Sequence, residues 1–63
     1  MNFESMNQYL GKVVKLTLLN GFWYKAKIIS VDIHAVTFIE LRGRTVSVEP
    51  SNIILCEEVS NGN

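Results

Sequence analysis

The chain has too few cysteine and histidine residues to build a disulfide or a metal site. Its 63 residues include one cysteine, Cys56, and one histidine, His34. A single cysteine cannot form an intrachain disulfide, and this pair is too small a set of ligands for zinc. No nucleophile, base and orienting group stand in a recognisable pattern, and no glycine-rich phosphate loop occurs. We therefore expect no catalytic residues, no metal, no cofactor and no small-molecule substrate.

The chain also lacks the apolar segments that membranes and secretion require. No apolar run approaches the ~20 residues of a membrane span. The first residues, MNFESMNQ, lack the basic and apolar regions of a signal peptide. We therefore expect a soluble cytoplasmic protein that does not bind membranes, with Cys56 in its reduced form.

An excess of charge of either sign is absent as well, because six basic and six acidic residues cancel. A neutral chain attracts a phosphate backbone weakly, which argues against a protein that wraps duplex DNA. It is compatible with a protein that reads a few exposed bases by stacking. A chain of this length forms one domain, residues 1–63, and buries only about 60% of its unfolded surface. We expect oligomerisation to supply the missing stability.

The first eleven residues are predicted to form a short helix. Phe3, Met6 and Leu10 are spaced to share one helical face, Asn2 can cap the start, and Gly11 suits the end. A helix this short is marginal alone. We expect the three apolar side chains to cover an open end of the rest of the fold.

From Lys12 the apolar period becomes two, which predicts five strands over residues 12–59. Val14, Leu16 and Leu18 share one face of the first strand, and Asn20-Gly21 predicts a hairpin. Small Ala26 permits a sharp bend within the second strand. The remaining boundaries follow from turn residues at Asp32–His34, Arg42–Arg44 and Pro50–Asn52. They place the last four strands at Phe22–Val31, Ala35–Leu41, Thr45–Glu49 and Ile53–Val59.

The predicted fold is therefore all-β: a short N-terminal helix followed by a five-stranded, strongly bent barrel of the SH3-like type. Five short strands cannot make a two-sheet sandwich of normal thickness, so a sheet that closes on itself is favoured. Residues 60–63 are predicted to be a frayed tail.

Particular residues between Gly11 and Ala35 resemble a known motif. The segment G-K-V-V-K-L-T-L-L-N-G, then A-K-I at Ala26–Ile28, then Val31-Asp32, resembles the first Sm motif of the Sm, LSm and Hfq proteins. The resemblance implies an Sm-like barrel that assembles into a homo-oligomeric ring, of about five to seven subunits, and binds U-rich or A-rich single-stranded RNA.

The chain departs from the family pattern at several positions. Ala26 stands where a glycine is usual, and the base-binding asparagine expected after Asp32 is missing. The lysine and histidine that Hfq carries between strands four and five are absent from Glu49–Asn52. These departures favour an alternative function, a ring that serves as a structural or protein-interaction module without RNA binding.

The resemblance implies an RNA site in the loop after the second strand. Asp32 either orients that loop for a base or caps its own backbone, and both roles can hold together. His34 occupies a position where a flat ring can stack on a base, although a loop histidine is often only solvated. Ser51 or Asn52 would lie across from it.

Three other residues are candidate RNA contacts. Phe22, Trp23 and Tyr24 are consecutive, so at least one must face outward, toward a subunit interface or a ligand. Arg42 can contact a phosphate or remain solvated in its turn. Phe22, Trp23 and Arg42 are therefore candidates beside the loop.

The family's ring pairs strand four of one subunit with strand five of the next. In this chain the apolar contacts of that interface would come from Val46, Val48, Ile53, Ile54 and Leu55.

Overall fold

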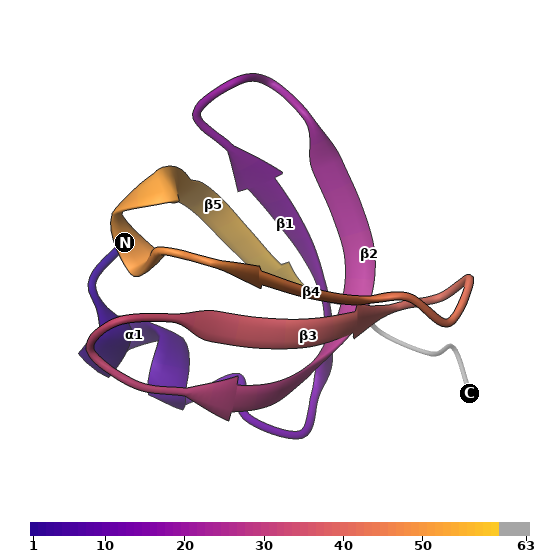
Figure 1. The fold of residues 1–63 in the computed structure, drawn as a ribbon, viewed down its shortest axis with the longest axis horizontal. Coiled ribbons are helices and arrows are strands. Elements are labelled where there is room, and N and C mark those ends of the chain that lie inside the picture. Colours follow the sequence, from indigo (N-terminus) through magenta and orange to yellow (C-terminus); the bar gives the residue numbers. More distant parts are fainter. Residues whose placement is uncertain (60–63) are drawn as a thin grey trace.

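The computed structural model describes residues 1–59 and shows a mainly β protein with one short helix (Figure 1). The predicted tail at 60–63 lies outside the described residues. The helix is α1, Phe3–Asn7, and a single 3-10 turn, η1, spans Pro50–Asn52. The strands are β1 (Val13–Leu18), β2 (Trp23–Val31), β3 (Val36–Glu40), β4 (Thr45–Val48) and β5 (Ile53–Glu58). Each predicted strand boundary that was stated differs from the observed one by at most one residue.

The five strands form one antiparallel sheet in the order β4-β3-β2-β1-β5. Among residues 1–59 no ladder joins β4 to β5, so the sheet is open and these two strands form its edges. The five-stranded antiparallel prediction is thus confirmed, whereas closure of the sheet within one subunit is not observed.

The β2 strand is staggered between its two neighbours, and it curves through the fold in Figure 1. Its pairing with β1 covers Trp23 to Lys27, and its pairing with β3 covers Ala26 to Val31. The two pairings overlap only at Ala26 and Lys27. Ala26 is fully buried there, and the ladder with β3 has an irregularity between Ile28 and Ser30. A small side chain suits this crowded crossing, which agrees with the role expected of Ala26.

Two hairpins use the same three-residue loop. In the first, the Leu18 amide donates to the Phe22 carbonyl and only Gly21 has a positive φ, of 88°. In the second, the Glu40 amide donates to the Arg44 carbonyl and Gly43 has a φ of 99°. This is a turn followed by a left-handed glycine, a common loop for short hairpins. Asn20 has no positive φ; its side chain instead accepts a 2.9 Å bond from the Phe22 amide.

One hydrophobic cluster lies on the inward face of the sheet. It contains the alternating residues of β1 predicted to share one face, together with side chains from the other elements. Its buried members are Met6, Val14, Leu16, Leu18, Ala26, Ile28, Val36, Phe38, Ile53 and Cys56.

The helix is shorter than predicted and covers the core with different residues. It ends at Asn7, and the Tyr9 and Leu10 amides bond to carbonyls three residues earlier, so the chain tightens and turns. Leu10 is consequently 49% exposed, contrary to prediction. Tyr9 packs on the core in its place, and its hydroxyl donates to the Cys56 carbonyl at 3.3 Å. The predicted spacing assumed a helix that continued through residue 10.

We predict that Met6→Ala lowers the free energy of unfolding by about 2–5 kcal/mol, because it leaves a cavity in the core. Met6 is fully buried, whereas Leu10 is half exposed on the same segment. Leu10→Ala is the matched control and should cost less than about 1 kcal/mol. Urea denaturation followed by circular dichroism measures both, and equal losses would show that the helix is not anchored through Met6.

Candidate functional site

The loop between β2 and β3 is held in shape by Asp32. Its Oδ1 accepts the His34 amide at 2.7 Å and the Ala35 amide at 2.8 Å. The Asp32 amide in turn donates to the Ala35 carbonyl at 3.0 Å. The Ala35 and His34 amide bonds hold the pKa of the Asp32 carboxyl below its usual value, since they stabilise its charged form. The turn-forming role of Asp32 is confirmed, and a role in holding a base stays a prediction.

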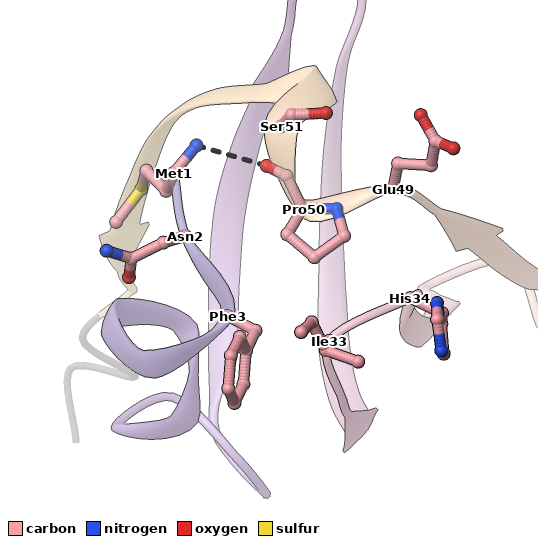
Figure 2. A pocket seen from close by; sticks show the side chains of 8 residues that line it. All are labelled: Met1, Asn2, Phe3, Ile33, His34, Glu49, Pro50 and Ser51. Carbon is pink, nitrogen blue, oxygen red and sulfur yellow. Dashed lines mark hydrogen bonds between the residues drawn. The ribbon is translucent and has the colours of Figure 1, made fainter.

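This loop borders an open groove at the end of the sheet (Figure 2). The groove has a volume of about 820 Å³. Three segments build it: the chain before and at the start of α1, the β2–β3 loop, and the start of η1. It is lined by Met1, Asn2, Phe3, Ile33, His34, Glu49, Pro50 and Ser51.

The groove is held together by contacts between the N-terminal segment and η1. The backbone nitrogen of Met1 donates to the Pro50 carbonyl at 3.0 Å and also bonds to the Ile53 carbonyl. The Oδ1 of Asn2 accepts the Ser5 amide at 2.8 Å and so caps the helix. Figure 2 shows Pro50 above, with Phe3 on the helix side and Ile33 on the loop side.

The chemistry of the groove is apolar with a few polar groups. Phe3, Ile33 and Pro50 supply apolar surface, while His34 and Ser51 supply an imidazole and a hydroxyl. Its lining holds one carboxylate, that of Glu49, and no lysine or arginine. Such a surface can stack a flat ring and hydrogen-bond its edge, but it offers no lysine or arginine side chain to a phosphate.

The residues predicted to contact RNA divide into two groups. His34 and Ser51 line the groove, and Asp32 shapes its loop. Asn52 does not line it; its carbonyl accepts the Leu19 amide at 2.9 Å. Ile33 lies in the predicted loop and also lines the groove. No RNA contact was predicted for its own side chain, because a lone apolar residue in a turn carries no sequence signal.

Trp23 and Arg42 line a second pocket, between the start of β2 and the β3–β4 turn, of about 330 Å³. Phe22 precedes Trp23 in the chain and is exposed, but it does not line this pocket. Arg44 also lines this pocket and bonds the buried Glu40 carboxylate at 3.0 Å. That hydrogen bond raises the pKa of Arg44 and occupies one side of its guanidinium. The structure thus separates the loop residues from the aromatic and arginine residues.

The one cysteine, Cys56, is buried in the core. Burial raises the pKa of the Cys56 thiol to about 11, and the Glu57 carboxylate adds to this effect, so the thiol is protonated at neutral pH. Within residues 1–59 no group of three or more His, Cys, Asp or Glu side chains is placed to hold a metal. No helix of that part of the chain is long and apolar enough to cross a membrane.

We predict that Asp32→Ala releases the β2–β3 loop, because it removes the shared acceptor of two backbone amides. Amide hydrogen exchange at His34 and Ala35 should become faster at neutral pH. Asp32→Asn keeps an acceptor oxygen and is the matched control.

The same carboxylate sets a pH dependence. Its folded pKa is lowered, so its contribution to loop stability is present above the unfolded value near 3.8 and is lost as pH falls through the folded value. Asp32→Asn should keep the loop ordered and abolish this acid-dependent change. Unchanged exchange in Asp32→Ala would show that other contacts hold the loop.

Comparison with known proteins adds no relative: no family model, no curated protein and no solved structure matches the chain. The resemblance to the Sm motif therefore depends on the residues between Gly11 and Ala35 alone. Function has to be argued from the edges of the sheet, the groove and the distribution of charge.

Proposed function

We propose that the chain is an Sm-like protein that assembles into a homo-oligomeric ring, of about five to seven subunits, and binds single-stranded RNA without catalysis. The observation that carries this proposal is the sheet order, which leaves β4 and β5 as edges. These are the two strands that the family's ring would pair between neighbouring subunits. One chain leaves its barrel open. Pairing of β4 with β5 of the next subunit would continue the sheet across the subunit boundary.

Unprotected edges support assembly on physical grounds. An edge strand presents unpaired amides and carbonyls, and proteins cover such edges or pair them with another chain. On β5, Ile54 and Leu55 are 53% and 48% exposed. On β4, Val46 and Val48 are half-buried and pack against the core. These four residues remain the proposed apolar contacts.

Ile53 was expected in the same interface, but its side chain is fully buried in the subunit's own core. It follows η1 directly, and its partner Leu18 also faces inward. The Ile53 side chain is therefore not available to a neighbouring subunit, and its carbonyl is already bonded to the Met1 nitrogen.

The groove supports the RNA part of the proposal. It lies where η1 connects the two edge strands, so ring assembly would repeat it once in each subunit. A base could stack on the His34 ring, with Ser51 and the backbone as hydrogen-bond partners. One stacked base contributes about 1–3 kcal/mol, which is weak alone, and repetition around a ring supplies avidity.

The composition of the groove also favours a second function. Glu49 repels phosphate, and no lysine or arginine lines the groove. A ring with this groove could serve as a protein-interaction module that does not bind RNA. Titration with RNA decides between the two functions.

We predict that the protein is not a monomer at micromolar concentration. Light scattering should give about five to seven times the chain mass of 7.1 kDa. Leu55→Lys places a charge on the β5 edge and should dissociate the ring. Ile29→Lys is the matched control, because Ile29 is also exposed but lies in the central strand β2. A monomer-sized wild type would remove the ring from the proposal.

We predict that the wild-type ring binds labelled oligo-U or oligo-A with micromolar or tighter affinity in fluorescence anisotropy. His34→Ala should weaken binding about five- to tenfold, which corresponds to the loss of roughly 1 kcal/mol of stacking. His34→Phe keeps a flat ring and is the matched control. Affinity should depend weakly on salt, because stacking rather than phosphate contact dominates.

Two outcomes would contradict the groove as the RNA site. If only Trp23→Ala or Phe22→Ala weakens binding, RNA binds beside the second pocket instead. If the wild-type protein binds neither oligonucleotide, the interaction module replaces the RNA-binding ring.

A further inference from the structure

The outward side chains of β1, β2 and β3 form one continuous surface on the side of the sheet away from the core. The register sets Lys15 opposite Lys25, and Lys27 opposite Ile39. The Leu41 amide donates to the Lys25 carbonyl at 3.2 Å, which brings Leu41 beside that lysine. We call this surface the basic face and define it by Lys15, Trp23, Lys25, Lys27, Ile39 and Leu41.

Although the net charge is zero, the basic and acidic residues lie on different parts of the surface. Half of the six lysine and arginine residues lie on it, and Arg42 and Arg44 line the adjoining pocket. The carboxylate of Glu40 near that pocket is buried and paired with Arg44. Glu57 of β5 lies opposite Lys15 of β1. Among the described strands it is the one acidic residue that the pairing register places next to the basic face. The others lie in the helix, in the β2–β3 loop, beside the groove and at the end of β5, as Glu4, Asp32, Glu49 and Glu58.

The face is apolar as well as basic. Trp23 and Leu41 are 59% and 63% exposed, and Ile39 is 37% exposed. The second pocket, of about 330 Å³, opens beside Trp23, Lys25 and Leu41 and can receive a single side chain. Ile39 and Leu41 lie beside Lys27 and Lys25, so the face matches a ligand that carries both acidic and apolar groups.

Single-stranded RNA matches this face less well. Trp23 is the one aromatic side chain of the face, and the Lys15 ammonium lies 5.0 Å from the centre of its ring. That cation–π contact covers one side of the indole, where a base would otherwise stack. Ile39 and Leu41 offer a base no comparable platform.

We infer that the basic face docks an acidic, amphipathic segment of a partner protein. Carboxylates of the segment would pair with Lys15, Lys25 and Lys27, and an apolar side chain would enter the second pocket. Charge complementarity selects the partner class, and the pocket fixes its position along the face. This inference concerns the opposite side of the sheet from the core and does not depend on RNA binding in the groove.

The test uses the full chain and three fluorescent peptides of about 12 residues, a length typical of docked linear segments. The first alternates glutamate with leucine and phenylalanine. The second has lysine in place of glutamate, and the third has serine in place of the apolar residues. The first peptide should bind at least about tenfold more tightly than either of the others in anisotropy, because only it supplies both kinds of contact.

Variants locate the site. Lys25→Glu should weaken the acidic peptide about tenfold or more, and Leu41→Ser several-fold, while Lys12→Glu should leave binding unchanged. Lys12 is the matched control because it is an exposed lysine outside the face, 3.5 Å from Glu58. Thermal melting confirms that each variant remains folded. His34→Ala, which tests the RNA site, should not affect the peptide.

Three results would overturn the inference: equal affinity for all three peptides, no measurable binding of the acidic peptide, or equal weakening by Lys12→Glu and Lys25→Glu. A fourth result would show that the basic face binds nucleic acid instead: Lys25→Glu loses oligo-U or oligo-A binding while its peptide binding does not change. If the wild-type protein does not bind RNA, the peptide result is unaffected. The RNA-binding hypothesis and the peptide-docking hypothesis can therefore be rejected independently.

Discussion

The stagger of β2 between β1 and β3 is the constraint on which the rest of the structure depends. The first half of β2 pairs with β1 along one edge, and the second half of β2 pairs with β3 along the other edge. The two ladders overlap only at Ala26 and Lys27. A sheet built in this way curves around its inward face, so a chain of 63 residues can enclose one core without a second sheet. Both β4 and β5 become edges as a result, and the outward face of β2 lies at the centre of the opposite surface.

Much of this fold was predictable because local patterns and tertiary packing agree. Strand alternation, the glycine of each hairpin and the proline before β5 each determine a local geometry that the sheet then uses. The helix was less predictable. Its apolar spacing fitted a longer helix, but the turn after Asn7 directs Tyr9 to the core and leaves Leu10 exposed. Short helices owe their length to packing more than to propensity, so spacing alone could not show where this one ends.

The candidate site was predictable only in part. The sequence identified the loop at Asp32 and His34 and left Ser51 or Asn52 across from it, and the structure brings His34 and Ser51, but not Asn52, to one groove. The first three residues could not be assigned to that groove, because the contacts of Met1 with Pro50 and Ile53 span about fifty residues of chain. The Ile33 side chain could not be assigned to it because a lone apolar residue in a turn carries no sequence signal. The net charge of the sequence also did not indicate where a basic surface would form, because the pairing register of the strands determines which charged residues become neighbours. Lys15 and Lys25 meet across two strands although ten positions separate them.

The position of β5 has a consequence for the order of folding. The β1–β2, β2–β3 and β3–β4 pairings each join strands that follow one another in the chain, through loops of a few residues. Only the pairing of β1 with β5 joins distant strands, from Leu18 to Ile53. Loop closure is cheap for the first three and more costly for the last, unless the intervening hairpins have already shortened the effective loop. We therefore expect the meander to form first, and β5 together with the N-terminal segment that contacts η1 to complete the molecule at the end of the folding reaction.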